Sequence, residues 1–250
     1  MKTMLLREKD LRKGSLILVN RQHPLRLRPA ENELEPVCIG GEQVQMQRAP
    51  TVFLRELALV SGENLMAVSG YRTGEEQKAL YFSSLNQNGL TFTEQYVARP
   101  SCSEHETGLA VDLGKKDDTV DSIRPHLPYD GLFGAYRKKL LLYGFCERYQ
   151  KEKEKITGIA AEPWHFRYVG APHAQIMQEL DFCLEEYLSF LKQYRYPANR
   201  FVYQNGGLKT YVSFVPLQNG GWAELAVRES IPYSISGNNV DGFILTEWGY

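Results

Sequence analysis

Hydrophobic positions change their spacing several times along the chain, and each change predicts a different element of secondary structure. The apolar run at 16–19 predicts a short strand, whereas 20–50 is rich in Pro, Gly, Asn and Glu and is expected to be irregular. Between residues 51 and 61, apolar residues recur at roughly helical spacing, which predicts a helix. A short apolar stretch at 66–68 predicts another strand.

A second helix is predicted to begin at Thr73. Thr73 is followed three residues later by Glu76, which is the pattern of a capping box, and the Asn88-Gly89 pair supplies a C-terminal cap. Arg72 directly precedes this helix and follows the strand at 66–68. Its side chain therefore lies at a strand-to-helix junction, from which it can be aimed at a cleft.

Residues 109–113 alternate in the period of a strand. The apolar residues Leu109, Val111 and Leu113 are expected to face the core, and Asp112 is expected to point the other way. A carboxylate on the open face of a well-packed strand is a rigid position for a metal ligand.

The second half of the chain mixes helical and extended patterns. The segment at 151–155 alternates in charge and is expected to be a solvated loop, and a strand is expected to start after Gly144. Residues 162–169 are aromatic and are expected to be extended, because Pro163 argues against a helix there. Three helices are predicted, at 132–143, 172–181 and 184–194.

The character of the chain changes after about residue 200. Strand-like runs separated by Gly- and Asn-rich turns predict a small antiparallel β appendage. We therefore expect two parts, a main domain at 1–198 and a β-rich C-terminal appendage at 199–250. The expected fold class is α+β, with a small antiparallel sheet that carries the functional site and helices packed around that sheet.

Composition excludes several classes of function. The chain has 250 residues, of which 43% are apolar, and it carries 29 Lys and Arg against 30 Asp and Glu. This balance gives no global basic field, so nucleic acid is not an expected partner. The four cysteines form no C-x-x-C pair, which argues against a structural zinc finger and suits reduced thiols.

Apolar runs near the N-terminus are too short for a signal peptide, whose core spans roughly 7–15 residues. Nor does any stretch approach the roughly 18 apolar residues of a membrane helix. The expectation is therefore a cytoplasmic protein without a membrane anchor.

Two of the five histidines lie beside carboxylates at suggestive spacings. His105 stands seven residues before Asp112, and His165 follows Glu162 by three residues. Catalytic zinc sites commonly use three N or O ligands and leave the fourth position to water, while a further carboxylate acts as general base. Spacing alone leaves open which acid is the ligand, although Asp112 is short and lies on a strand whereas Glu162 has the longer reach.

A simpler interpretation also stays open at this point, because a histidine near an aspartate is commonly an ordinary hydrogen-bonded pair. The zinc helix motif H-E-x-x-H is absent. Cys102 is not expected to be a ligand, because a fourth protein ligand would close the water position. His126 and His173 each stand beside a proline and are predicted to be surface residues.

Three strings, taken together, closely resemble the VanY/VanXY group of D-alanyl-D-alanine peptidases, zinc enzymes that cut peptidoglycan precursors. The strings are SGYRTGEEQ at 69–77, SEHETGLAVDLG at 103–114 and EPWHFRYVG at 162–170. They occur in the order of the family, and the resemblance covers roughly residues 15–195.

The resemblance implies a role for each matching residue. His105, Asp112 and His165 match the ligands of Zn²⁺. Glu162 matches the catalytic base, and Arg72 matches the arginine that polarises the scissile carbonyl. Two further residues match positions that help to hold the substrate, Ser103 and Gln77.

The resemblance also implies an activity and a partner. The expected reaction is zinc-dependent hydrolysis of the D-Ala-D-Ala bond, in the dipeptide or at the C-terminus of the precursor pentapeptide, linked to glycopeptide (vancomycin) resistance. The partner is then a small peptide, and the missing anchor favours the soluble VanXY type. Two alternatives are an L-alanyl-D-glutamate endopeptidase of the same fold and a zinc-stabilised binding module without catalysis. Arg72 and Glu162 argue against the second, because a structural zinc site needs neither.

Overall fold

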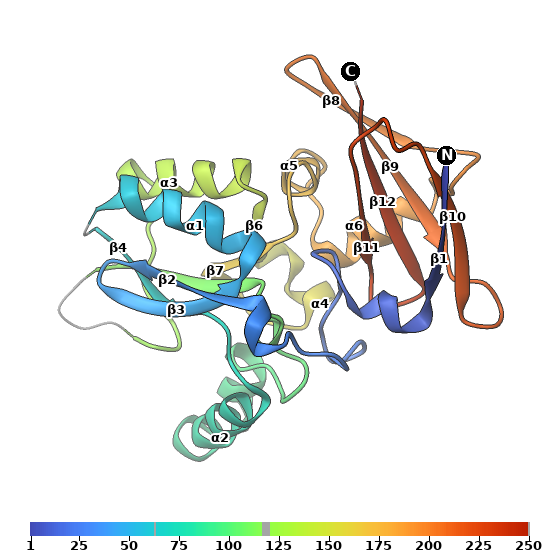
Figure 1. The fold of residues 1–250 in the computed structure, drawn as a ribbon. Helices are drawn as coiled ribbons and strands as arrows, with labels where there is room; N and C mark the ends of the chain where they lie inside the picture. The colour runs from blue at the N-terminus through green and yellow to red at the C-terminus, as the bar shows by residue number, and fades with distance from the viewer. Residues whose placement is uncertain (63, 117–120, 250) are drawn as a thin grey trace. The chain divides into compact units, whose positions relative to one another are not determined.

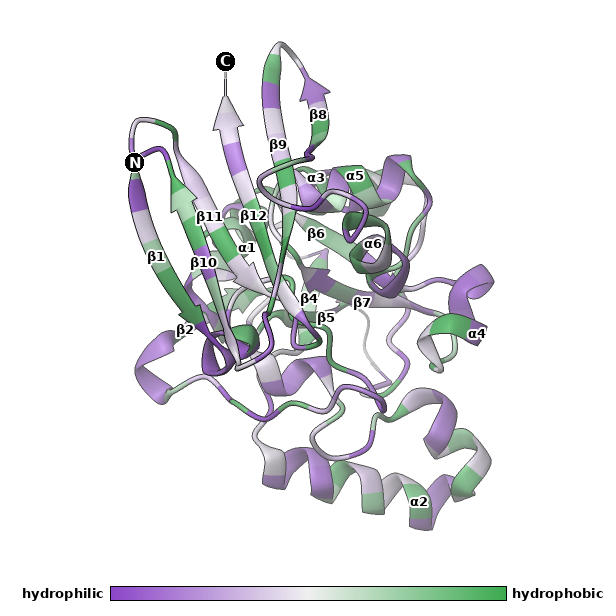
Figure 2. Ribbon diagram, turned by 90° about the vertical axis from the view of Figure 1, so that its right-hand side faces the viewer, coloured by the Kyte–Doolittle hydropathy of each residue, from purple (hydrophilic) through white to green (hydrophobic). Residues whose placement is uncertain are grey.

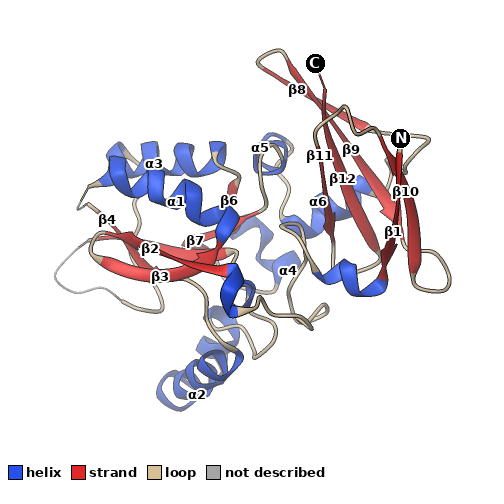
Figure 3. Cartoon of the chain, viewed as in Figure 1, coloured by secondary structure: helices blue, strands red, loops and turns tan. Residues whose placement is uncertain are grey.

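A computed structural model describes residues 1–62, 64–116 and 121–249 of the chain (Figure 1). The chain forms two compact units. The larger unit is Val19–Cys183, and the smaller unit combines Met1–Leu18 with Leu184–Tyr250. Each unit contains both helix and strand, and the α+β prediction is confirmed (Figure 3).

The larger unit is built on a four-stranded antiparallel sheet in the order β4-β5-β7-β6. Helices α1 and α3 lie side by side along one face of this sheet, and α2 lies on the opposite side (Figure 1). A separate hairpin, β2-β3, precedes α1. The strands are β2 (Leu34–Ile39), β3 (Glu42–Gln47), β4 (Leu65–Ser69), β5 (Ala110–Lys115), β6 (Phe145–Tyr149) and β7 (Glu162–Tyr168). The helices are α1 (Arg48–Ser61), α2 (Gly74–Tyr96), α3 (Gly131–Leu142), α4 (Glu154–Thr157) and α5 (His173–Glu179).

The core of the larger unit lies between the sheet and helices α1 and α3. Val111 and Leu113 of β5 are fully buried in it, together with Leu54 and Leu57 of α1. Burying one such side chain stabilises a fold by about 1.5–3 kcal/mol relative to leaving it exposed. One face of β5 is thus anchored by packing, and this holds the backbone of Asp112 in place.

Helix α2 begins as the sequence predicts. The Thr73 hydroxyl accepts a hydrogen bond from the backbone N–H of Glu76 (3.2 Å), and the Glu76 carboxylate accepts one from the backbone N–H of Thr73 (2.8 Å). The predicted end at Gly89 is a kink, because Gly89 has a φ of 79° and the helix then continues to Tyr96. A hydrogen bond between the hydroxyls of Ser84 and Thr93 (2.8 Å) joins the two segments.

Burial along α2 is unusual, since hydrophilic and hydrophobic residues alternate along it in Figure 2 and its buried residues are all polar. These residues are Gln77, Ser84 and Thr93. The helix is therefore held to the rest of the larger unit partly through hydrogen bonds. One of these is made by Gln77, which also contacts a residue of the functional site described below.

In its described residues, the smaller unit contains two sheets, one α-helix and a short 3-10 helix, Glu8–Arg12. Strands β1 and β10 pair antiparallel, and the other sheet has the order β11-β12-β9-β8. Its core gathers Leu11, Leu225, Phe243 and Leu245. The elements are β1 (Lys2–Arg7), α6 (Leu184–Leu191), β8 (Phe201–Asn205), β9 (Leu208–Pro216), β10 (Trp222–Val227), β11 (Tyr233–Gly237) and β12 (Gly242–Gly249).

This division differs from the predicted boundary between residues 198 and 199. The start of the chain joins the C-terminal strands because β1 pairs with β10, and α6 belongs to the same unit. Pairing between the two ends of a chain leaves no local signal in the sequence. That the two units are separate domains stays a prediction.

Two predictions for secondary structure in the N-terminal part are wrong. Residues 16–19 are buried but form no strand, and 20–50 contains the hairpin β2-β3. The hairpin buries only Val37, Ile39 and Met46, so its apolar signal is sparse. A run of apolar residues, conversely, indicates burial without specifying the backbone conformation.

The charged segment at 151–155 is also not a solvated loop. It forms a short 3-10 helix, Lys151–Lys153, and the start of α4. Lys153 is buried, and its ammonium donates a hydrogen bond to the carbonyl oxygen of Asp181 (2.6 Å). No helix in the described ranges is long and apolar enough to cross a membrane.

Candidate metal centre

Pairing within the four-stranded sheet brings together two residues that are far apart in the sequence. Asp112 of β5 lies directly opposite His165 of β7. His105 comes from a short 3-10 helix, Glu104–Thr107, just before β5. Gly108 ends this helix with a left-handed conformation (φ 69°), which favours glycine and turns the chain into the strand.

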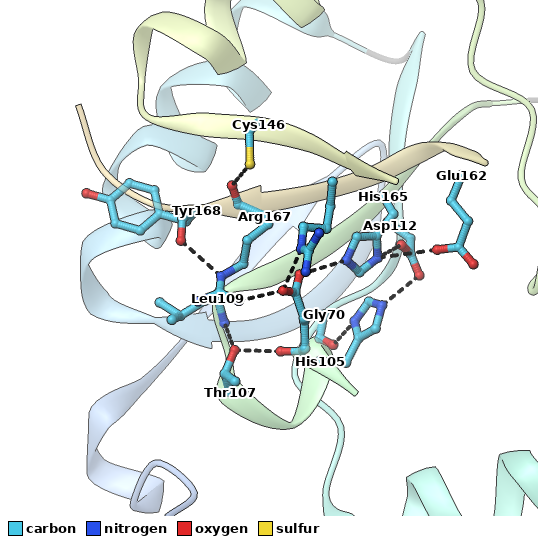
Figure 4. A network of polar contacts seen from close by, with 12 residues as sticks. Gly70, His105, Thr107, Leu109, Asp112, Cys146, Glu162, His165, Arg167 and Tyr168 are labelled. Carbon is cyan, nitrogen blue, oxygen red and sulfur yellow. Dashed lines mark hydrogen bonds and ion pairs between the residues drawn. The ribbon is translucent and has the colours of Figure 1, made fainter. Parts of the chain in front are cut away.

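The three side chains form one compact, buried cluster (Figure 4). His105 Nε2 lies 3.0 Å from Asp112 Oδ2, and His165 Nδ1 lies 2.9 Å from Asp112 Oδ1. One ligand atom from each residue lies within 4.8 Å of the others. Two imidazole nitrogens and one carboxylate oxygen suit zinc, whereas magnesium and calcium prefer oxygen ligands throughout.

Charge in the cluster favours a bound cation. Burial would raise the pKa of Asp112, but His105 and His165 hold it well below its usual range. Burial lowers the pKa of His165, but its hydrogen bonds to Asp112 and Glu104 outweigh that effect and raise the value to about 10. The arrangement thus favours a positive charge beside Asp112, and a bound metal ion would supply one.

Glu162 stands at the start of β7 and is buried beside the cluster. Its Oε2 lies 3.9 Å from His165 Nδ1. Burial raises the pKa of Glu162 to about 8; the neighbouring His165 acts in the opposite direction, and the charges of Asp112 and Glu104 add smaller upward contributions. A carboxylate whose pKa is raised toward neutrality is suited to accept a proton and to return it.

Arg72 lies at the junction between β4 and α2, where the sequence places it. Its Nη1 donates to Gln77 Oε1 (2.6 Å), and its Nη2 donates to the Ser69 hydroxyl (2.8 Å). Gln77 is fully buried, and its Nε2 donates to the carbonyl oxygen of Ala98 (2.6 Å). The amide of Gln77 therefore contacts Arg72 and the backbone, although the sequence predicts that it holds the substrate.

A single pocket collects all of these side chains. It spans about 510 Å³, a volume that includes space open to solvent, and its wall also contains the apolar residues Leu80, Tyr96, Ile123 and Trp164. The seven residues singled out from the sequence all line it: Arg72, Gln77, Ser103, His105, Asp112, Glu162 and His165.

The remaining candidates lie elsewhere. His126 is exposed, as predicted, and Cys102 does not belong to the cluster. His173 is buried, so its prediction as a surface residue is wrong. It begins α5, which packs against β6, and the neighbouring proline gave no indication of that packing.

One residue near the cluster was missed from the sequence. Glu104, directly before His105, is buried and contacts His165. The charges of Arg167 and Arg148 hold its pKa well below the usual range against the effect of burial. A glutamate within a motif carries no sign of burial, so only the structure could identify it.

Comparisons with known proteins identify the relatives of this chain. The family model for VanY, D-alanyl-D-alanine carboxypeptidase, matches residues 45–171. The chain is 40% identical over 183 residues to VanXYC of Enterococcus gallinarum, a bifunctional D-Ala-D-Ala dipeptidase and D-Ala-D-Ala carboxypeptidase; the match covers 72% of this chain and 96% of that one.

One solved structure extends the similarity to 99% of the chain. The vancomycin resistance D,D-dipeptidase VanXYg, in complex with a D-Ala-D-Ala phosphinate analog, is 41% identical with a TM-score of 0.91, covering 99% of each chain. A variant of a vancomycin resistance D,D-pentapeptidase VanY, in complex with Zn(II), is 32% identical with a TM-score of 0.54; it covers 70% of this chain and 99% of that one.

Proposed function

Because the chain belongs to the VanY family of D-alanyl-D-alanine carboxypeptidases, we propose that it is a zinc-dependent D,D-peptidase of the VanXY type. It hydrolyses the D-Ala-D-Ala bond in the free dipeptide, at the C-terminus of the precursor pentapeptide, or in both. The observation that carries this proposal is the cluster of His105, Asp112 and His165, with Glu162 and Arg72 in the same pocket.

The metal in this proposal is Zn²⁺, held by His105, Asp112 and His165. Their donor set of two nitrogens and one oxygen fits a catalytic zinc site with an open position. When bound, zinc supplies a Lewis acid that polarises a carbonyl and lowers the pKa of water from 15.7 to about 7.

Glu162 moves the proton in this reaction. Its carboxylate takes a proton from the water that attacks the scissile carbonyl. A C–O bond forms, the C–N bond then breaks, and Glu162 returns the proton to the leaving D-alanine amine. Its buried position beside the cluster and its raised pKa support this role.

Arg72 stabilises the negative charge that develops on the carbonyl oxygen. Its guanidinium keeps its charge and presents a planar set of donors. Loss of such a donor typically costs on the order of 2.7–4 kcal/mol of transition-state stabilisation. Gln77 acts through Arg72, whose Nη1 it holds, while Ser103 contacts the substrate from the pocket wall.

This activity fits a role in vancomycin resistance. Removing D-Ala-D-Ala ends removes the target to which the drug binds. Cytoplasm is the compartment we propose, since thiols stay reduced there and all four cysteines are free. They are Cys38, Cys102, Cys146 and Cys183.

Purified protein loaded with zinc tests the proposal directly. Release of D-alanine from the dipeptide and from a precursor pentapeptide is measured separately, and hydrolysis of at least one is expected. The variant Glu162→Ala should abolish turnover while zinc stays bound. No turnover of either peptide would refute the proposal, and cleavage inside intact muropeptides would favour an endopeptidase.

A further inference from the structure

Glu104 is a buried charge outside the proposed reaction. It opens the 3-10 helix that carries His105, and its side chain is 0% exposed. Burying a carboxylate is costly unless charged partners and hydrogen bonds compensate. A buried carboxylate with charged partners beside a metal cluster suggests a role in the function of the cluster as well as in stability.

The two carboxylate oxygens of Glu104 have different neighbours. Its Oε1 accepts hydrogen bonds from Arg148 Nε (2.9 Å) and Arg167 Nη1 (2.7 Å), and both arginines are buried. Its Oε2 lies 3.4 Å from His165 Nε2. Arg148 comes from β6 and Arg167 from β7, so two paired strands of the sheet anchor one end of the carboxylate while the other end faces His165.

The two histidines of the cluster present different ring nitrogens to Asp112. His105 presents Nε2, while its Nδ1–H donates to the carbonyl oxygen of Gly70 (2.7 Å). His165 presents Nδ1, and its Nε2 faces Glu104. A neutral imidazole carries one proton, so the acceptor on one side determines which nitrogen keeps its lone pair for a metal.

We propose that Glu104 is a positioning residue that holds His165 as the Nε2–H tautomer and so directs the Nδ1 lone pair at the metal. This inference rests on the proposed zinc site. Metal-binding histidines commonly donate their second N–H to a carboxylate or a carbonyl, which fixes the ring and its tautomer. His105 uses a backbone carbonyl for this purpose, and His165 uses a side chain that substitution can remove.

The two arginines make Glu104 a dependable acceptor. Two positive charges on Oε1 stabilise the ionised carboxylate, so Glu104 accepts the proton of His165 in a hydrogen bond without removing it. They also fix where the carboxylate lies, because both guanidinium groups belong to the sheet that carries His165.

The isosteric variant Glu104→Gln tests this role. In this variant the two arginines are expected to donate their hydrogen bonds to the amide oxygen. The amide NH₂ then faces His165 Nε2 as a donor. His165 is expected to move its proton to Nδ1, where the proton competes with the metal. Zinc affinity, measured by competition with a chelator, should weaken 10–100-fold, which is typical for loss of such a partner.

Glu106 offers a matched control. It is two residues further along the same 3-10 helix, is equally buried, and pairs with Arg28 and the backbone N–H of Ser101. The variant Glu106→Gln removes a comparable buried charge but does not touch the contact to His165. Its zinc affinity should stay within about threefold of the wild type, on the same reasoning.

Histidine ¹⁵N NMR supplies a readout that general loosening of the fold would not change. In the zinc-loaded wild type, His165 should be protonated at Nε2 and His105 at Nδ1. In metal-free Glu104→Gln, the His165 proton should be found at Nδ1. The wild-type spectrum remains a test even if the variant does not fold, since protonation of His165 at Nδ1 in the zinc-loaded protein would overturn the proposal.

The outcomes separate this inference from the proposed function. A wild type that hydrolyses D-Ala-D-Ala, with equal zinc affinity in Glu104→Gln, would overturn the role of Glu104 alone. Equal weakening in Glu104→Gln and Glu106→Gln would overturn it as well. A wild type that binds no zinc would overturn both proposals.

Discussion

Gln77 gives the sharpest test of how the pocket works. Its amide joins Arg72 Nη1 to the carbonyl oxygen of Ala98, and it is fully buried on α2. The variant Gln77→Leu keeps an approximately similar volume and removes both hydrogen bonds. Among the described residues, the Arg72 guanidinium then keeps its hydrogen bond to the Ser69 hydroxyl, through Nη2.

The size of the effect follows from the bond that is lost. A hydrogen bond to a charged group contributes about 1.5–3 kcal/mol. If the whole of that is lost in the transition state, kcat/KM for D-Ala-D-Ala falls by roughly 10–100-fold, since each 1.36 kcal/mol is tenfold in rate. This is less than expected for Arg72→Ala, where loss of the donor itself costs on the order of 2.7–4 kcal/mol.

A double-mutant cycle decides whether Gln77 acts through Arg72. If it does, the double variant Arg72→Ala, Gln77→Leu should be no more than about threefold slower than Arg72→Ala alone. If Gln77 binds the substrate directly, the two effects should add. Additive losses would therefore refute the reasoning from the structure and restore the role that the sequence suggests.

Stability needs its own control in this experiment, because Gln77→Leu leaves the Ala98 carbonyl without this donor. Ser84→Ala is a suitable match: Ser84 is buried on the same helix and hydrogen-bonds Thr93, away from Arg72. It should lower the free energy of unfolding by about 1 kcal/mol and leave kcat/KM unchanged. Assays well below both melting temperatures, with circular dichroism to check the fold, keep the two effects apart.

Three further predictions concern the metal cluster and one buried histidine. Glu162→Gln should lower kcat by about 10²–10⁴-fold, the usual contribution of a general base, and calorimetric titration should show that zinc still binds. Loss of zinc binding in this variant would place Glu162 among the ligands. Removing zinc with a chelator should abolish turnover and lower the Tm. A ligand at a hundred times its Kd stabilises the folded state by about 2.7 kcal/mol. An unchanged Tm would argue against a metal held by the folded protein. Burial lowers the pKa of His173 to about 4. Between that value and about 6.5 only the unfolded state binds the proton, so stability should fall as the pH falls, by up to about 1.4 kcal/mol per unit. Urea midpoints at pH 7 and pH 4.5 should differ less in His173→Gln, and an equal difference would exclude His173 as the cause.

Local patterns in the sequence determined several parts of this molecule. The capping box at Thr73 starts α2 where expected, and the alternation at 109–113 matches β5 with its apolar residues buried. These signals can be recognised because helix and strand have fixed periods. Burial of one face therefore produces a regular spacing of apolar residues in the sequence. The same segments carry the motifs that indicate the family.

Tertiary structure decided which distant surfaces meet. The pairing of β1 with β10, the burial of His173 and the contacts of Glu104 with two arginines have no periodic signature. The sequence by itself determined several of the elements and indicated the chemical groups of the site. Their arrangement depended on the free energy of the whole chain, because burying Glu104 is favourable only after β6 and β7 have brought Arg148 and Arg167 beside it.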